Sequence, residues 1–409
     1  MFHSKSTRAV AAALAVGAGL GLAAPAQADV TIGVLYGVTG PIANFIPALF
    51  EATSLAVDQI NDQGGVLGQK LGTAVGDTQC APQGAVDAAQ KLVSVENVPI
   101  IVGALCSSAT IAAANAVAIP NGVAMISPAS TSPAITTLED NDLVYRLVVS
   151  DAFQGKVLAK VVKQRGIKTV ALTYVNNDYG VGLAGSFRDA FTKLGGIITA
   201  DQVHEDKKAS YRSELATLAG AKPDALVLIS YAGGSGITMI RQSLENDFFD
   251  TFIGADGMRD ALLIEQLGEE NLKTTFGTVP SSPPDSSAGK KFKDAFVAKY
   301  KTTENKLFIE QTYDSVFVSA LAIQMAGSTD RAAVAKAIRK VTNPPGVKIE
   351  PGEWAKALAA IKAGKDVDYE GVAGSETLDA NGDVGGWFAV WQVEGETFKE
   401  VESIPPGSR

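Results

Sequence analysis

From Val30 to Pro128 the sequence alternates short apolar segments with longer segments whose apolar residues recur at helical spacing. The short segments have the length of strands, and the spacing in the longer ones is typical of helices packed on a core. Strands that are apolar on both faces indicate a parallel sheet covered by helices on both sides. The expected strands are 30–36, 71–75, 98–105 and 122–128, and the expected helices are 46–62, 84–95 and 108–118.

The alternation starts again after a polar stretch at 136–151. A Pro- and Ser-rich break then leads into three or four amphipathic helices between 287 and 363, and the segment 379–404 is typical of a strand hairpin with its turn at Asn381-Gly382. The sequence therefore predicts an α/β fold with two doubly wound, parallel-sheet lobes, between which the chain crosses more than once. Ligands are expected in the cleft between the lobes. The expected strands of the second lobe are 169–175, 196–203, 223–231 and 250–256.

The first 28 residues are typical of a secretory signal peptide. Lys5 and Arg8 precede a small, apolar stretch at 9–24, and Ala26-Gln27-Ala28 matches the small-residue pattern of a cleavage site. The alternative, a retained membrane anchor, is disfavoured because the apolar stretch is shorter than the roughly 20 residues of a spanning helix. We expect cleavage before Asp29 and export of the remaining chain.

Charge and cysteine content narrow the partners and the compartment. Without Lys5 and Arg8, the 35 basic residues fall to 33 against 44 acidic ones, a net charge of −11. An acidic surface disfavours nucleic acid and anionic membranes as partners. In an exported chain, two cysteines usually form a disulfide, so we expect Cys80 and Cys106 to be paired; two buried free thiols are the alternative.

Several polar side chains follow apolar strands, where binding groups gather in open α/β sheets. Ser107 and Ser108 stand where a helix begins, so each hydroxyl is expected either to cap the helix or to meet an anion. Asp256 ends the expected strand at 250–256, and it is either the cap of the next helix or a ligand-binding carboxylate. The residues alone leave both choices open.

An enzyme is the main alternative from another class, and the sequence disfavours it. After the expected cleavage only one histidine remains, His204, in a polar segment where we expect it to be exposed. A catalytic triad and a histidine-ligated metal site would both have to be built from this one histidine. The acidic segment at 379–390 lacks the glycine and glutamate of a calcium-binding loop, since Val384 and Val390 stand at those positions. We therefore expect no catalysis, no cofactor and no bound metal.

Seven segments together resemble one protein family, and they follow in order over nearly the whole chain after residue 28. They are "GPIANF", "INDQGGVLGQKL", "GALCSSAT", "MISPASTSPAIT", "NDYGVGL", "FIGADG" and "DYEGVAGSETLDANGDVGG". The chain is similar to the periplasmic branched-chain amino acid-binding proteins of ABC transporters. This resemblance implies a type I periplasmic binding protein fold with three crossovers, a periplasmic location, a monomer and a membrane permease as partner. It also implies lobes of 29–147 plus about 280–372, and of 148–279 plus about 373–409.

The resemblance also implies a ligand site for an amino acid zwitterion. Ser107 and Thr131 match the residues that hold the α-carboxylate, and the backbone of Ser130 faces the ligand beside them. Asp256 matches the carboxylate that receives the α-ammonium group, and Tyr179 matches a tyrosine that closes from the other lobe. Donors at one end and an acceptor at the other are what a desolvated zwitterion requires.

Three positions depart from the family pattern. Asp256 stands where glutamate is common, Phe45 covers the ligand side chain where the Leu/Ile/Val receptor has tryptophan, and Tyr231 takes a tyrosine role one position early in "SYAGGSG". The ligand class is therefore less constrained than the fold, and an amide, urea or an aromatic acid is the alternative to an amino acid. A sensor of the same fold, serving a receptor instead of a permease, is a further alternative.

Overall fold

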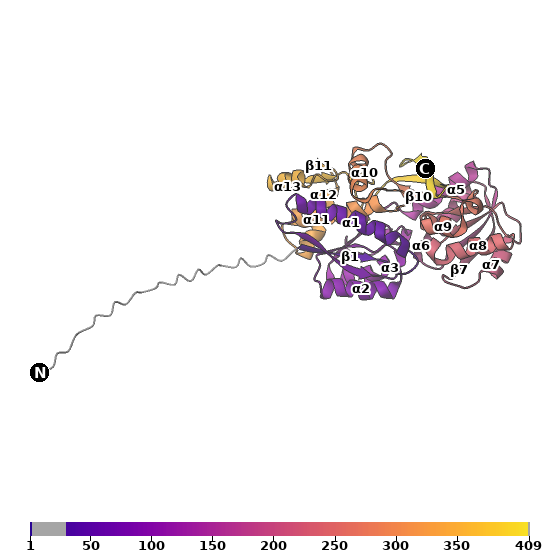
Figure 1. Cartoon of the computed structure of the whole chain (residues 1–409), viewed down its shortest axis with the longest axis horizontal. Coiled ribbons are helices and arrows are strands. Elements are labelled where there is room, and N and C mark those ends of the chain that lie inside the picture. The colour runs from indigo at the N-terminus through magenta and orange to yellow at the C-terminus, as the bar shows by residue number, and fades with distance from the viewer. Residues whose placement is uncertain (2–29, 408–409) are drawn as a thin grey trace.

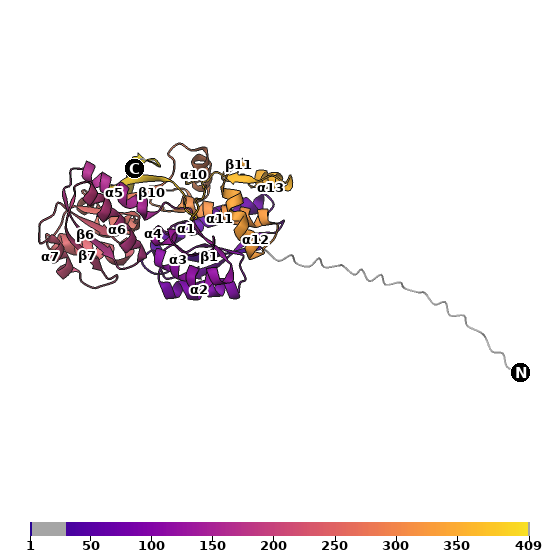
Figure 2. The same cartoon turned by 180° about the vertical axis from the view of Figure 1, so that it is seen from behind.

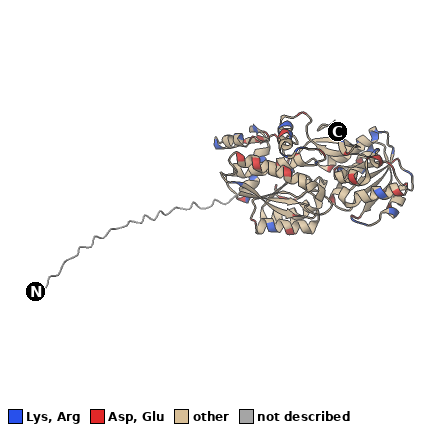
Figure 3. Ribbon diagram, viewed as in Figure 1, with Lys and Arg blue, Asp and Glu red and all other residues tan. Residues whose placement is uncertain are grey.

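The computed structural model describes Met1 and residues 30–407. The expected signal peptide and its cleavage site lie outside the described residues, apart from Met1. The chain forms two α/β lobes that lie side by side, each around its own sheet (Figures 1 and 2). Positive and negative residues are interspersed over both lobes (Figure 3). Among the helices that the structure describes, none combines the length and the apolar character needed to cross a membrane.

The first lobe is built on a five-stranded sheet with all strands parallel, in the order β2-β1-β3-β4-β5. Its central strands are buried along their whole length, because helices cover both faces. The strands are β1 (Val30–Tyr36), β2 (Leu71–Asp77), β3 (Ile100–Gly103), β4 (Ala124–Ser127) and β5 (Val144–Arg146).

Helices from two distant parts of the chain cover this first sheet. The helices α1, α11 and α12 lie on one side, and α2 and α3 lie on the other (Figure 1). A parallel pair, β11 (Val347–Ile349) and β12 (Val367–Tyr369), packs beside α13 and α12. The helices are α1 (Ile46–Asp62), α2 (Pro82–Ser94), α3 (Ser107–Ala113), α4 (Pro133–Thr136), α10 (Ser287–Tyr300), α11 (Ile309–Ala326), α12 (Arg331–Thr342) and α13 (Trp354–Lys362).

The second lobe has a seven-stranded sheet in the order β14-β13-β10-β9-β8-β6-β7. Five of these strands are parallel, and β13 and β14 are added at one edge as an antiparallel hairpin. The strands are β6 (Thr169–Val175), β7 (Ile197–His204), β8 (Ala225–Ile229), β9 (Phe252–Gly254), β10 (Phe276–Ser281), β13 (Trp387–Glu394) and β14 (Thr397–Ile404).

Five helices cover the second sheet. The helices α5 and α6 pack against each other, and α5 reaches β10 and β13, whereas α7, α8 and α9 pack in series. Side-chain caps fix where two of them begin: Ser150 accepts a hydrogen bond from Ala152 N ahead of α5, and Asn177 accepts one from Gly180 N ahead of α6. The helices are α5 (Asp151–Gln164), α6 (Asp178–Lys193), α7 (Arg212–Ala219), α8 (Ile237–Glu245) and α9 (Ala261–Leu267).

The chain passes between the lobes three times. The first passage follows β5, the second follows β10, and the third joins β12 to β13. Residues from all three passages, among them Leu147, Ser281 and Gly385, line one small cavity. The two lobes are therefore joined by three segments that lie close together, which is the arrangement of a hinge.

Three details of the sequence-based prediction are wrong. The C-terminal hairpin turns at Gly395, whose φ is +63°, and not at Asn381-Gly382, which forms a separate turn in the third passage. The stretch at 136–151, which the sequence analysis treats as polar, contains the strand β5. This strand was missed because only three of its residues pair with β4. Helix α11 is not amphipathic: it is buried on nearly all sides between α1 and the first sheet.

Candidate functional site

The order of strands determines where the two lobes present a binding site. In each sheet the chain moves first to one side of a starting strand and then to the other, at β1 in the first sheet and at β6 in the second. At such a point the loops that follow neighbouring strands diverge and leave a crevice at the carboxyl ends. Phe45 follows β1 and Ser107 follows β3, whereas Tyr179 follows β6 and Tyr231 follows β8.

One cavity lies where the two crevices face each other. Six of the seven predicted ligand residues line it, the exception being Ser130. The lining residues are Ile42, Phe45, Leu49, Leu105, Cys106, Ser107, Ala129, Thr131, Tyr179, Tyr231, Asp256, Gly257 and Phe308. The cavity is therefore shared between both lobes.

The wall from the first lobe carries hydroxyl groups at its polar end. Ser107 is the first residue of α3, and its Oγ accepts a hydrogen bond of 3.2 Å from Ser132 N. Thr131 is fully buried, and within the described part of the chain its Oγ1 has no hydrogen-bond partner. The two hydroxyls can both donate to an anion, and neither serine at the start of α3 caps that helix with its side chain.

The wall from the second lobe carries a buried carboxylate. Asp256 is 4% exposed; its Oδ1 accepts hydrogen bonds from Gln154 Nε2 at 2.9 Å and from Tyr179 OH at 3.3 Å. Burial raises the pKa of Asp256 to about 6, against these hydrogen bonds, which lower it. Asp256 does not cap α9, because Asp260 does so by accepting from Leu262 N at 3.0 Å.

Aromatic rings complete the cover of the cavity. The rings of Tyr179 and Tyr231 stack with their centroids 5.2 Å apart, so the two tyrosines form one surface of the second lobe. Phe45 faces the cavity from the segment ahead of α1 and is 8% exposed. Phe45 therefore belongs both to the hydrophobic core and to the wall of the cavity.

The apolar end of the cavity was not predicted from the sequence. Ile42, Leu49, Leu105 and Phe308 line it, all from the first lobe. Each of them belongs to an ordinary apolar segment, so no sequence signal separates these residues from the core. Together they form a wall suited to an aliphatic or aromatic group.

Ser130 does not line the cavity. Its hydroxyl is hydrogen-bonded to Thr110 Oγ1 at 2.6 Å, and its N donates to Ser127 Oγ at 3.0 Å. The guanidinium of Arg146, paired with Asp383 at 2.7 Å, donates to the Ser130 carbonyl at 3.4 Å. Ser130 therefore braces the loop that presents Thr131.

Two buried polar residues beside the site were missed. Asp151 begins α5 and is 0% exposed, and its N donates to the Thr131 carbonyl at 2.8 Å. Burial, followed by the negative charge of Asp256, raises the pKa of Asp151 well above its usual value. Gln154, one turn later on α5, is the residue that donates to Asp256. Both follow the first passage between lobes, a place where the sequence gives no strand-end signal.

Hydrogen bonds across the cleft hold the lobes together. Ser108 Oγ donates to Asp178 Oδ2 at 2.5 Å, and Ser132 Oγ donates to the Asp178 carbonyl at 2.8 Å. Asn44 Nδ2 donates to Asp260 Oδ1 at 2.5 Å. Ser108 thus neither caps α3 nor lines the cavity; it joins the first lobe to the start of α6. The structure is that of a closed cleft.

Cys80 and Cys106 form a disulfide, with their Cα atoms 5.4 Å apart, and this prediction is confirmed. Cys80 follows β2 and Cys106 follows β3, which flank β1 instead of pairing with each other. The bond therefore joins loops from both sides of β1. It holds Ser107, the next residue, at the cavity wall.

His204 is buried, contrary to the exposed position expected from its polar surroundings. Its Nδ1 is hydrogen-bonded to Thr173 Oγ1 at 2.8 Å and its Nε2 to Ser235 Oγ at 2.7 Å. Burial lowers the pKa of His204 to about 4. Both ring nitrogens have partners, so the residue is a structural member of the second lobe.

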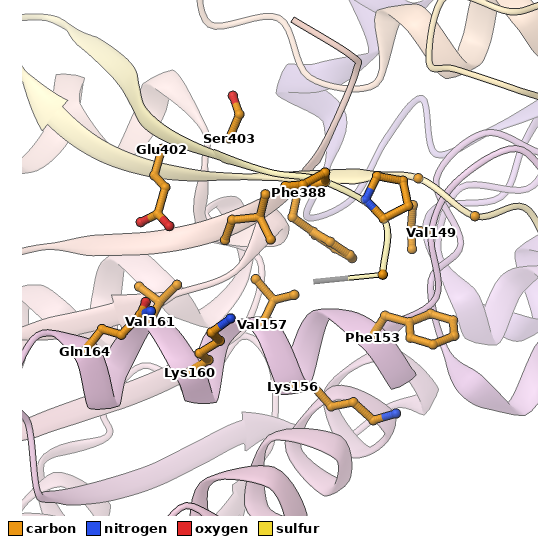
Figure 4. Close-up of a pocket in the computed structure, with 16 residues that line it drawn as sticks. Val149, Phe153, Lys156, Val157, Lys160, Val161, Gln164, Phe388, Glu402 and Ser403 are labelled. Carbon is orange, nitrogen blue, oxygen red and sulfur yellow. The ribbon is translucent and has the colours of Figure 1, made fainter. Parts of the chain in front are cut away.

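A second cavity lies away from the cleft, between α5 and the β13–β14 hairpin. Figure 4 shows Val157 and Phe388 facing each other across it. Its charged lining residues, among them Lys156, Lys160 and Glu402, are all exposed. Binding sites orient their ligands with a few well-placed polar groups, and this cavity has no buried one among the residues described. We therefore assign the functional site to the cavity between the lobes.

Two lobes joined by three passages, with a cavity closed between the carboxyl ends of both sheets, define a ligand-binding protein with the type I periplasmic binding protein fold. The family model described as "Periplasmic binding protein" matches residues 29–373. The chain belongs to this family.

Several proteins to which the chain is similar are named for binding branched-chain amino acids. A Leu/Ile/Val-binding protein homolog from Brucella melitensis is 31% identical over 324 residues, which are 77% of this chain and 84% of that protein. The leucine-binding protein LivK of Thermotoga maritima superposes with a TM-score of 0.79 at 27% identity, over 93% of this chain and all of that one. The substrate-binding protein LivJ of Streptococcus pneumoniae, in complex with isoleucine, superposes with a TM-score of 0.77 at 25% identity, over the same shares. All three are named as binding proteins.

Proposed function

We propose that this protein captures an amino acid with an apolar side chain in the cavity between its lobes and delivers it to the permease of an ABC importer. The observation that carries the proposal is the distribution of groups around the cavity. Hydroxyls of Ser107 and Thr131 come from the first lobe, and the carboxylate of Asp256 comes from the second. Apolar side chains line the space beside them.

This distribution suits a zwitterion. Ser107 and Thr131 donate to the α-carboxylate, and Asp256 accepts from the α-ammonium group. Removing either charge from water without such a partner costs several kcal/mol, so a ligand with only one of them binds poorly. The apolar wall then selects an aliphatic side chain. The similarity of the chain to a leucine-binding protein and to a LivJ protein in complex with isoleucine supports this choice.

In this proposal, ligand binding also explains why the cleft between the lobes closes. The α-carboxylate is held by one lobe and the α-ammonium by the other, so both sets of contacts form only when the cleft is closed. A ligand shifts a conformational equilibrium by its difference in affinity for the two states. The inter-lobe hydrogen bonds of Asp178 add to the closed state.

The first prediction is that Asp256→Asn sharply lowers affinity. The substitution keeps the shape and removes the charge that faces the ammonium group. Loss of one partner of a buried, hydrogen-bonded charge pair costs about 2–5 kcal/mol, so the Kd for L-leucine rises roughly thirty-fold to several thousand-fold. Ser107→Ala has a smaller effect, because the backbone N–H groups at the start of α3 remain. Isothermal titration calorimetry measures the Kd for L-leucine of the wild type and of both variants.

Asp224→Asn is the matched control. Asp224 accepts hydrogen bonds from Lys168 N and Thr169 N, both at 2.9 Å, at the amino-terminal end of the strands and far from the cavity. Its replacement lowers stability and leaves the Kd unchanged. An unchanged Kd in Asp256→Asn, with the fold intact, contradicts the proposed role of that carboxylate.

The proposed location is the periplasm, and the proposed form is a monomer.

A thermal-shift screen over the amino acids, short amides, urea and benzoate tests the ligand class, because a ligand at a hundred times its Kd adds about 2.7 kcal/mol of stability. Stabilisation by amides, urea or benzoate alone contradicts the proposal. Stabilisation by leucine, isoleucine or valine supports it.

A further inference from the structure

Arg146, the last residue of β5, is buried and uses every hydrogen-bond donor of its side chain. The side chain is 0% exposed, and its guanidinium group makes five hydrogen bonds to other residues of the chain. A guanidinium group has five N–H donors in a fixed planar arrangement, so each of them has an acceptor. Arg146 is not among the residues that line the cavity between the lobes. Its role there is therefore indirect.

One side of the guanidinium group holds the loop that presents Thr131 to the cavity. This loop, 128–132, connects β4 to α4. Arg146 Nη1 donates to the carbonyl of Ser132 at 2.8 Å and to the carbonyl of Ser130 at 3.4 Å. Thr131 lies between these two contacts and lines the cavity. The backbone on both sides of Thr131 is thus held by a single side chain.

The other side of the guanidinium group holds the third passage between the lobes. Its Nε donates to Asp383 Oδ1 at 2.7 Å and its Nη2 donates to Asp383 Oδ2 at 2.9 Å, which makes a bidentate ion pair. Nη2 also donates to Thr136 Oγ1 at 2.6 Å, and this hydroxyl donates to Asp383 Oδ2 at 2.7 Å. The backbone makes the same connection, because Arg146 N donates to the Gly382 carbonyl at 3.1 Å.

We propose that Arg146 is a positioning residue of the ligand site, which couples the loop that presents Thr131 to the third passage of the hinge through Asp383. The inference rests on the proposed function and extends it from the cavity to the hinge. One rigid, planar group joins the two segments, so a movement of the third passage shifts the 128–132 loop with it. The same loop meets the second lobe, because Ser132 Oγ donates to a carbonyl at the start of α6.

Arg339 of α12 provides a matched comparison. It pairs with Asp142 at 2.6 Å and donates to the carbonyls of Asp379 and Ala380, which belong to the same third passage. Among the described residues, none of its hydrogen bonds reaches the 128–132 loop. This second ion pair therefore holds the third passage without holding the ligand site.

Arg146→Lys tests the coupling in the intact protein. Lysine keeps the charge, but three donors on one nitrogen atom cannot hold the Asp383 carboxylate and two loop carbonyls together. We expect the Kd for L-leucine, measured by calorimetry, to rise roughly 3- to 100-fold, the range of couplings within one hydrogen-bond network. The control Asp142→Asn leaves the Kd unchanged. An unchanged Kd in Arg146→Lys, or an equal rise in both variants, overturns the inference while leaving the proposed function intact.

Thr131→Ala distinguishes positioning of the site from a general structural role. It removes the hydroxyl whose place Arg146 determines, so we expect Arg146→Lys to weaken binding by a smaller factor in this background than in the wild type. The same factor in both backgrounds means that Arg146 does not act through Thr131, and the inference is then wrong.

Thr136→Val keeps the proposal testable if Arg146→Lys does not fold. It preserves the ion pair and removes the one hydroxyl that bridges Arg146 and Asp383. We expect the Kd for L-leucine to rise roughly 2- to 10-fold, as for one lost hydrogen bond. A Kd equal to that of the wild type overturns the inference. A wild type that binds benzoate and no amino acid overturns both the inference and the proposed function.

Discussion

At the scale of residues, His204 couples stability to pH. Its ring is hydrogen-bonded on both sides inside the second lobe, and burial lowers its pKa to about 4, compared with about 6.5 in an unfolded chain. Between these two pKa values, His204 is therefore protonated in the unfolded chain and neutral in the folded protein. The contribution of neutral His204 is complete above pH 6.5 and is lost as the pH falls toward 4.

We predict that this loss amounts to about 3 kcal/mol in the free energy of unfolding. His204→Gln removes the titration, so the variant is less stable than the wild type at pH 7 and the difference narrows at pH 4. Urea unfolding of both proteins at pH 7, 5.5 and 4 measures this difference in the free energy of unfolding. The other titrating groups contribute equally to both proteins. A difference that stays constant with pH contradicts the assigned pKa.

Residues differ in how far the sequence predicts their place at the site. Ser107, Thr131 and Asp256 follow strands in recognisable segments, and the structure brings all three to the cavity. Asp151 follows no strand end but a passage between lobes, so its burial depends on how the second lobe packs against the first. The apolar residues Leu49 and Phe308 look like core in the sequence, and only the closed cleft distinguishes them.

At the scale of elements, the contact between α6 and α4 depends on a residue without a side chain. A Cβ atom on Gly182 would lie 2.7 Å from Pro133 Cδ and 3.0 Å from Ser132 Oγ, both in the first lobe. Gly185, one turn along α6, has no atom within 4 Å of the same position. An added Cβ atom therefore meets the first lobe at Gly182 and not at Gly185, and this difference exists only when the cleft is closed.

We predict that Gly182→Ala weakens ligand binding roughly 5- to 150-fold, because overpacking of a close contact costs about 1–3 kcal/mol. Gly185→Ala leaves the Kd unchanged. Both variants stabilise the ligand-free protein slightly, since alanine favours the helix. Calorimetry gives the Kd, and thermal unfolding gives the stability. Equal affinities for the two variants contradict a role of this contact in closure.

Elements with strong patterns were predicted well, and short ones were not. The strands β1, β6 and β8 are continuous apolar runs and lie where expected. The strand β5 has only three residues, so pairing with β4 in the folded sheet defines it, not its own sequence. The hairpin turn was placed at Asn381-Gly382 by its local signal, although the pairing of β13 with β14 puts it at Gly395.

At the scale of the whole molecule, closure changes the overall dimensions. The described cleft is closed, with the lobes joined by hydrogen bonds from Ser108, Ser132 and Asn44. We predict that the ligand-free protein in solution has a larger radius of gyration than the protein saturated with L-leucine, because the lobes separate about the three passages. Small-angle scattering with and without the ligand measures this. Equal radii contradict hinge closure.

The type I fold and the three passages were predicted from the resemblance and are present, whereas the lobe boundaries stay a prediction. A boundary inside a hinge depends on which residues move, and sequence patterns describe only which residues pair or pack. The connecting segments at 147–150 and 370–386 carry no periodicity that separates one lobe from the other.

The three passages also determine when each lobe becomes complete as the chain is synthesised. The first sheet is fully made once β5 has emerged, yet α11, which covers it, comes more than 150 residues later. The second sheet is completed later still, because its β13–β14 edge follows all the other helices and strands among the described residues. The first sheet therefore lacks part of its cover while the chain of the second lobe is being made. Such a protein depends on whatever keeps nascent apolar surfaces apart during that interval.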